Sequence, residues 1–116
     1  MRHDAVRHIG ASAPLSEAVT LILLSLADHP RHGYSILKDV EELSEGRVVL
    51  STGTLYAAIQ RLLSDQWIER YAEDNATRGR VAYRLTTEGK QRLEEEANRM
   101  TRLAILAALR TRAQEG

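Results

Sequence analysis

The chain of 116 residues contains no cysteine, and this absence removes several classes of function at once. Without thiols there is no disulfide framework, no thiolate nucleophile, no cysteine-ligated zinc site and no thiol redox sensor. The chain also has no uncharged run of ~18 residues, the length that a membrane-spanning helix requires. Because residues 1–10 lack a continuous apolar segment, they do not resemble a secretion signal. We therefore expect a cytoplasmic protein.

Net charge is absent too, since 16 Lys and Arg balance 16 Asp and Glu. A nucleic-acid-binding domain is usually basic, so this total counts against such a function. The charges are nevertheless distributed unevenly: residues 78–84 carry three arginines and no acid, whereas Glu94, Glu95 and Glu96 stand together. A basic segment keeps its local attraction for phosphate even when a distant acidic segment cancels the sum.

Signals for catalysis and for metal or nucleotide binding are weak. The glycines are scattered singly, so the chain has no glycine-rich phosphate loop. A hydroxyl nucleophile would need a nearby base, but all four histidines lie near the N-terminus or in the segment 29–32. Asp28, His29 and His32 could form a surface metal site, but a helix end followed by a polar loop explains them better, because two histidines three residues apart on a proline-containing loop are a weak pattern. We expect no enzyme activity, no cofactor and no metal.

The segment 51–71 is the most informative part of the chain, because it predicts a helix that runs directly into a strand. At about 100° per residue, its large apolar residues share one face, namely Leu55, Ile59, Leu62 and Leu63. The opposite face is small and polar and has no acid before Asp65. A helix that enters the DNA major groove needs low bulk, little negative charge and groups that hydrogen-bond bases. A core helix with a plain surface is the alternative.

Three further helices are predicted around this segment. The first starts after Pro14, with Ser16 as its N-cap, and continues to about Asp28. The second runs from about Gly33 to Glu45 and buries Ile36, Leu37, Val40 and Leu43. The last begins at Thr86 or Thr87 and runs to about Arg112. Residues 1–14 show no periodicity and are interpreted as a loose arm.

Strands are predicted between and after these helices. The β-branched pair Val48 and Val49 indicates one short strand before the third helix. Residues 67–73 and 80–85 form a hairpin whose turn contains Asp74, Asn75 and Gly79, and whose tip is basic. Trp67, at the start of the hairpin, is better explained as a core residue than as a platform for a ligand. The fold class is mainly α with a small β-hairpin.

The first and last helices are more apolar than one small core requires. The first carries apolar residues almost all the way round, and residues 103–109 of the last, LAILAAL, are entirely apolar. Leu93, Ala97, Met100, Ala104 and Ala107 also follow one another at alternating spacings of four and three, as in a coiled coil. A homodimer in which each helix packs on the partner is therefore expected. We assign its interface to Leu15, Val19, Ile22, Leu23, Leu93, Ala97, Met100, Leu103, Ala104, Leu106 and Ala107.

Three segments, HGYSILKDVEEL (32–43), STGTLYAAIQRLLSDQWIE (51–69) and RGRVAYRLTTEGKQRL (78–93), resemble the PadR family of bacterial transcriptional regulators. The resemblance covers the chain from about Leu15 to its C-terminus. It implies a winged helix-turn-helix domain at 15–86 and a dimerisation helix and tail at 87–116. It also implies a homodimer that binds double-stranded DNA at a near-palindromic operator, usually as a repressor, and leaves open whether a small-molecule effector releases it.

The DNA contacts that the resemblance implies fall on the second and third helices and on the hairpin, or wing. They map to Tyr34, Lys38, Ser51, Thr52, Thr54, Tyr56, Gln60, Arg78, Arg80 and Arg84. The chain departs from the family pattern at Ala57, where proline is usual, and at Gln66, where glycine is usual. Loss of that glycine predicts a strained or altered helix end.

Some members of the compact branch of this family bind flat aromatic compounds through a tryptophan on the last helix. The last helix here has no aromatic residue, which argues against a pocket of that type. The competing hypothesis is a winged-helix protein-interaction module, dimeric through the same helices, that does not bind DNA. The neutral net charge is its main support.

Overall fold

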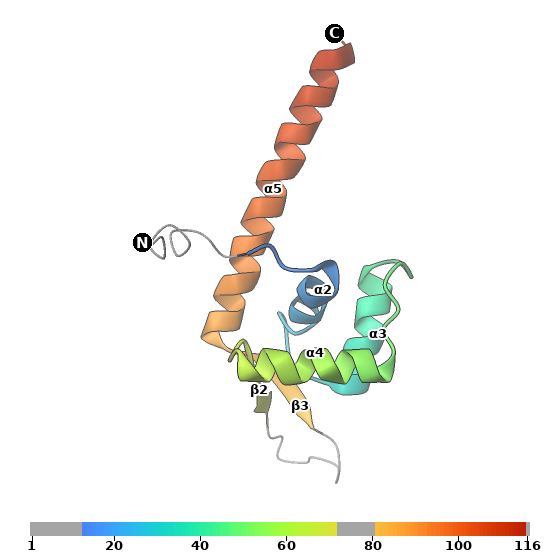
Figure 1. The fold of residues 1–116 in the computed structure, drawn as a ribbon, viewed down its shortest axis with the longest axis vertical. Coiled ribbons are helices and arrows are strands. Elements are labelled where there is room, and N and C mark those ends of the chain that lie inside the picture. Colours follow the sequence, from blue (N-terminus) through green and yellow to red (C-terminus); the bar gives the residue numbers. More distant parts are fainter. Residues whose placement is uncertain (1–12, 72–80, 116) are drawn as a thin grey trace, which may run out of the picture.

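The computed structural model describes residues 13–71 and 81–115, which form four helices and three strands. The helices are α2 (Glu17–Ser25), α3 (Gly33–Leu43), α4 (Thr52–Ser64) and α5 (Thr87–Glu115). The strands β1 (Arg31–His32), β2 (Ile68–Tyr71) and β3 (Ala82–Leu85) form one antiparallel sheet in the order β1–β3–β2. Figure 1 shows α2, α3 and α4 gathered into one body, from which α5 projects.

The predicted fold class, mainly α with a small hairpin, is therefore confirmed, with β1 as an additional strand. Ser16 is the N-cap of α2, because its hydroxyl oxygen accepts a hydrogen bond from the Val19 amide at 3.1 Å. Most of the predicted arm, 1–12, and the turn residues Asp74, Asn75 and Gly79 lie outside the described residues.

One apolar core joins the helices to the sheet. It is built from Leu21, Ile22, Leu23, Leu26, Ile36, Val40, Leu55, Ile59, Leu62, Ile68 and Tyr83. The helical spacings that predicted amphipathic faces on α3 and α4 are the reason that Ile36, Val40, Leu55 and Ile59 meet here. Leu43 is an exception, since it was expected in the core but is exposed at the C-terminal end of α3.

Burial also corrects two residues of the predicted dimer interface. Ile22 and Leu23 have no exposed surface, because they fill the core of their own chain. A helix that is apolar all round does not reveal which side faces its own domain and which faces a partner. Leu24, one residue further on, is exposed instead.

The strand predicted at Val48 and Val49 does not form. The Ser44 hydroxyl accepts a hydrogen bond from the Val48 amide at 2.9 Å, which occupies the group that a strand would offer to a neighbour. Val49 is exposed. The third strand comes instead from Arg31 and His32, which pair with Tyr83 and Ala82 of β3. The first helix likewise ends at Ser25, earlier than Asp28, and Arg31 donates a hydrogen bond to the Ser25 carbonyl at 2.6 Å.

The chain adopts a left-handed backbone conformation two residues after the end of α4. Gln66 has φ 64°, its amide donates to the Leu63 carbonyl, and the Trp67 amide donates to the Leu62 carbonyl at 3.0 Å. These two bonds define a Schellman motif, in which glycine is the favoured residue at the left-handed position. The strain predicted from the replacement of glycine by Gln66 is therefore present. Glu45, with φ 54°, ends α3 in the same way.

The start of α5 is fixed against the end of α4. Thr86 donates its hydroxyl hydrogen to the Gln66 carbonyl at 2.6 Å, and the same hydroxyl accepts from the Gly89 amide at 3.0 Å. The Thr86 amide donates to the Trp67 carbonyl at 3.1 Å. A Cβ on Gly89 would overlap that carbonyl, so the close approach of α5 to Trp67 requires glycine.

Two turns further along, α5 holds the segment before α2 through a buried carboxylate. Glu96 is only 4% exposed; it accepts a hydrogen bond from the Leu15 amide at 3.3 Å and a charged pair of bonds from Arg99. Arg92 adds a bond to the Ala13 carbonyl at 2.9 Å. The hydrogen bonds from Arg99, together with the Leu15 amide, hold the pKa of Glu96 below its ordinary value of 4.5.

Replacement of Gln66 by glycine should stabilise the protein. Glycine adopts positive φ without the clash that a Cβ causes, so the free energy of unfolding should rise by about 1 kcal/mol in urea titrations. The matched control is Gln91→Gly in the exposed interior of α5, where glycine should cost about 0.5–1 kcal/mol. A loss of stability at Gln66 as large as that at Gln91 would contradict the assigned strain.

The Glu96→Gln variant should lose stability at neutral pH and become less sensitive to acid. A carboxylate whose pKa is lowered on folding stabilises the fold above 4.5, and this contribution disappears as the pH falls through the lowered pKa. Urea titrations between about pH 3 and pH 7 should show a shallower acid limb for the variant. Glu94→Gln, on the exposed surface, should retain the slope of the parent protein.

Candidate nucleic-acid interface

The exposed face of α4 is the centre of the candidate interface. Its N-cap is Ser51, whose hydroxyl accepts from the Thr54 amide at 3.1 Å and donates to the Thr54 hydroxyl at 2.9 Å. Thr52, Thr54, Tyr56 and Gln60 are all exposed. No acidic residue occurs between Ser51 and Ser64. The face therefore offers hydroxyl and amide groups without negative charge, which suits contact with phosphates and base edges.

The start of α3 lies beside this helix. A Cβ on Gly33 would overlap the Tyr56 hydroxyl, so the tyrosine ring occupies the space that a side chain at Gly33 would need. The two helices thus meet where the motif His-Gly-Tyr opens α3. Sequence reasoning used this glycine only as part of the family resemblance and did not foresee its packing role.

Tyr34 and Lys38 project from the same end of α3. The Tyr34 side chain is 70% exposed, and the Lys38 ammonium lies 5.8 Å from the centre of its ring. They stand one turn apart on the helix, so a phosphate could contact both the hydroxyl and the ammonium. Asp39 adds little negative charge beside them, because Arg31 lies 3.6 Å from its carboxylate.

The hairpin brings Arg84 to an exposed position but also gives it partners within the chain. Arg84 of β3 is directly opposite Glu69 of β2, and the Arg84 Nε lies 2.8 Å from the Glu69 carboxylate. The guanidinium also lies 4.9 Å from the centre of the Tyr71 ring. Arg78 and Arg80 lie outside the described residues, so of the three predicted wing contacts only Arg84 is located by the structure.

The elements that carry these residues lie at one end of the molecule. Figure 1 shows α4, the start of α3 and the strands β2 and β3 together, whereas the C-terminal end of α5 points away from them. Between them, Tyr83 is buried, and burial raises the pKa of its hydroxyl, which therefore stays neutral. The arrangement places a third helix and a hairpin on one surface, as a winged helix does.

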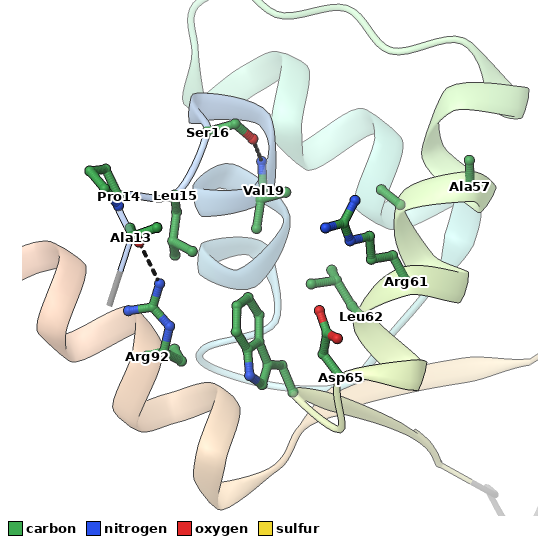
Figure 2. A pocket seen from close by; sticks show the side chains of 12 residues that line it. Ala13, Pro14, Leu15, Ser16, Val19, Ala57, Arg61, Leu62, Asp65 and Arg92 are labelled. Atoms are coloured by element: carbon green, nitrogen blue, oxygen red, sulfur yellow. Dashed lines mark hydrogen bonds between the residues drawn. The ribbon is translucent and has the colours of Figure 1, made fainter. Parts of the chain in front are cut away.

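Trp67 lies at the edge of the core, half-buried against the apolar cluster. Arg92 of α5 stacks on its ring, with the guanidinium carbon 5.1 Å from the ring centre. The packing role predicted for this residue is therefore present. Trp67 also lines a pocket between α2, α4 and α5, which is shown in Figure 2.

Across 13–71 and 81–115, the acidic and histidine side chains form no cluster that could hold a metal ion. Among the helices of these two ranges, none is both long and apolar enough to cross a membrane.

Comparison with known proteins identifies the family. A family model described as the transcriptional regulator PadR-like family matches residues 22–95. An uncharacterised 37.1 kDa protein in transposon TN4556 of Streptomyces fradiae is 38% identical over 89 residues. This match covers 77% of the present chain but 24% of that protein, so the chain spans about a quarter of its length. Uncharacterised protein X of Lysinibacillus sphaericus is 34% identical over 66% of the chain and 71% of its own.

Solved structures with the same fold point to the same family. A PadR family transcription regulator from hypervirulent Clostridium difficile R20291 is 31% identical, with a TM-score of 0.69 over 81% of this chain and 97% of that chain. Bacillus subtilis PadR, solved in complex with operator DNA, has the same fold at 23% identity, with a TM-score of 0.61 over 72% of this chain and 47% of that one. Because the family model covers well over half of the chain and these structures share its fold, the chain belongs to the PadR-like family of transcriptional regulators.

Proposed function

We propose that this chain is a DNA-binding transcriptional regulator that acts in the cytoplasm as a homodimer. The observation that carries the proposal is the exposed, acid-free face of α4, flanked by Tyr34 and Lys38 of α3. Such a face fits the major groove, with Gln60 and Thr52 in reach of base edges. The operator complex of Bacillus subtilis PadR supports the same use of the fold in this chain.

A dimer follows from the apolar surface that the single chain leaves open. Five apolar residues are exposed on α5, namely Met100, Leu103, Ala104, Leu106 and Ala107. Leu15 and Val19, at the start of the chain's helical body, are half-buried. A second copy would remove these side chains from water. Because a two-fold dimer presents two identical α4 helices, its DNA site should be nearly palindromic, with half-sites about one helical turn apart.

Repression is the simplest outcome of such binding, since a dimer on an operator excludes other proteins from the same DNA. A small molecule that changed the distance between the two α4 helices would release the operator. Tyr34, Lys38, Ser51 and the wing arginines would hold phosphates and set the position of the protein, whereas Gln60 and Thr52 would supply base readout.

The proposal is tested by fluorescence anisotropy with DNA from upstream of the protein's own gene and with a scrambled duplex, over a range of salt. We expect preference for the upstream DNA and an affinity that falls steeply with salt, because each neutralised phosphate releases counterions. The neutral net charge favours the alternative, a protein-interaction module. Absence of binding to both duplexes at low salt would contradict the DNA-binding proposal and favour that alternative.

Substitutions should separate positioning from readout. Arg80→Ala and Lys38→Ala should weaken binding to all duplexes alike and each reduce the slope against log salt by about 1. Gln60→Ala should mainly reduce the preference for the operator, by about 10-fold or more if its amide reads an adenine. Glu94→Ala, on the exposed surface of α5, serves as the control. Unchanged affinities for the Arg80 and Gln60 variants would refute the assigned contacts.

A further inference from the structure

Gly53, the second residue of α4, is a glycine for which the described chain gives no internal reason. The other glycines of 13–71 and 81–115 each have one: Gly33 and Gly89 make room for a neighbouring residue, and Gly46 has a positive φ of 83°. Gly53 lies in regular helix, and a Cβ at this position would meet no atom of the described chain within 4 Å, apart from its own helical turn. Alanine could therefore replace it without a clash or backbone strain.

Glycine at this position also costs stability. It loses more conformational freedom on folding than alanine does, and it is a poorer helix former. The start of α4 does not need it, because the Ser51 hydroxyl already caps the helix by accepting from the Thr54 amide. A residue that weakens a helix and serves no contact within the fold indicates a requirement from outside the chain.

Gly53 lies in the middle of the exposed face of α4. At about 100° per residue, it faces away from the core side chains of the helix, Leu55, Ile59 and Leu62. Gln60, two turns further along, lies on the same side of the helix as Gly53. Gly53 is also not part of the pocket between α2, α4 and α5, so an occupant of that pocket would not explain the glycine.

We infer that Gly53 is the point at which the backbone of α4 comes closest to the base edges of DNA, and that its missing Cβ sets how deeply α4 enters the major groove. The N-terminal residues of a recognition helix contact base edges. The middle of the exposed face of such a helix meets the floor of the groove, whereas its flanks meet the phosphates. The inference rests on the proposed DNA-binding function and adds a positioning residue to it.

The depth of insertion matters for the side chains around Gly53. Thr52 and Thr54 are short, and Gln60 has to bring its amide within about 2.7–3.2 Å of a base to form a hydrogen bond. A methyl group on residue 53 would hold the helix away from the groove floor and lengthen all these contacts together. One small substitution would thus weaken base readout without changing any group that performs it.

Phosphate contacts should change much less. Tyr34 and Lys38 project from α3, and the flexible four-carbon stem of Lys38 allows its ammonium to follow a small displacement of the helix. Binding to DNA of any sequence depends mainly on contacts of this kind. The loss should therefore be concentrated on the preferred DNA.

Gly53→Ala separates this role from a structural one, because the fold and the DNA complex should respond in opposite directions. The melting temperature of the free protein should rise by about 2–5 °C, since alanine is the better helix former. In fluorescence anisotropy, affinity for the preferred upstream DNA should fall about 10-fold or more. Affinity for the scrambled duplex should stay within about 3-fold of the parent, with an unchanged slope against log salt, because no charge is altered.

Gly46→Ala is the matched control. It makes the same chemical change beyond the C-terminal end of α3, opposite to the end that carries Tyr34, and at a positive φ that favours glycine. Its melting temperature should fall, and its affinity for the upstream DNA, measured below the melting transition, should equal that of the parent. Gly53→Leu tests the dependence on size: leucine also forms helices well, so the helix should remain while binding weakens further than with alanine.

The outcomes distinguish the inference from the function on which it rests. A parent protein that binds neither duplex would contradict the DNA-binding function itself. A parent that prefers the upstream DNA, together with an unchanged affinity of Gly53→Ala, would overturn only the role of Gly53. A lower melting temperature for Gly53→Ala would overturn it as well, since the chain itself would then need the glycine. Equal losses on both duplexes would overturn the approach to base edges and place the sugar-phosphate backbone at Gly53 instead.

Discussion

The junction between Gln66 and Gly89 links the three parts of the molecule. At this point α4 ends, the sheet begins and α5 starts, and the Thr86 hydroxyl connects them by donating to the Gln66 carbonyl while it accepts from the Gly89 amide. The left-handed backbone of Gln66 turns the chain so that Trp67 meets α5. A change at any of these residues would alter the angle between α4 and α5. The distance between two α4 helices in a dimer depends on that angle.

The charged groups of this protein act locally, and the net charge of zero conceals how unevenly they are distributed. Several ionic groups are already paired within the chain: Glu96 with Arg99, Glu69 with Arg84, and Asp39 with Arg31. The acids so neutralised include ones close to the candidate interface. What remains open is an acid-free α4 with Lys38 beside it and an α5 whose halves differ in sign. A neutral chain can therefore present one surface suited to phosphate and another suited to a second copy of itself.

Patterns along the sequence were sufficient to predict the helices and the hairpin, because the spacing of apolar residues follows directly from which side of an element is buried. They failed where a contact depended on distant residues. The strand at Arg31 and His32 is defined only by its pairing with β3, some 50 residues later, and two residues carry no detectable pattern. Val48 and Val49 had the composition of a strand, but the Ser44 hydroxyl occupied the Val48 amide.

The candidate site shows the same division between local and distant information. The polar face of α4 was predictable from spacing alone, whereas the pairing of Arg84 with Glu69 required the register of the hairpin. Glu96 could not be distinguished from Glu94 and Glu95 in the sequence, although it alone of the three is buried. Ile22 and Leu23 belong to a helix that is apolar on nearly every side, so the sequence did not show that they face the core of their own chain. The sequence thus predicted which face of α4 is exposed and polar, but not the interactions that hold the side chains around it.

If the proposed homodimer forms through α5, the exposed second half of this helix would link the lifetime of the protein to its abundance. A single chain leaves Leu103, Ile105 and Leu109 exposed, and in the proposed homodimer a second copy would cover them. Exposed apolar helices are the features by which chaperones and proteases recognise incomplete proteins. At low expression most chains would be cleared as monomers, and above a threshold the dimers would accumulate. A gene under such a protein would respond to its regulator with a step rather than in proportion.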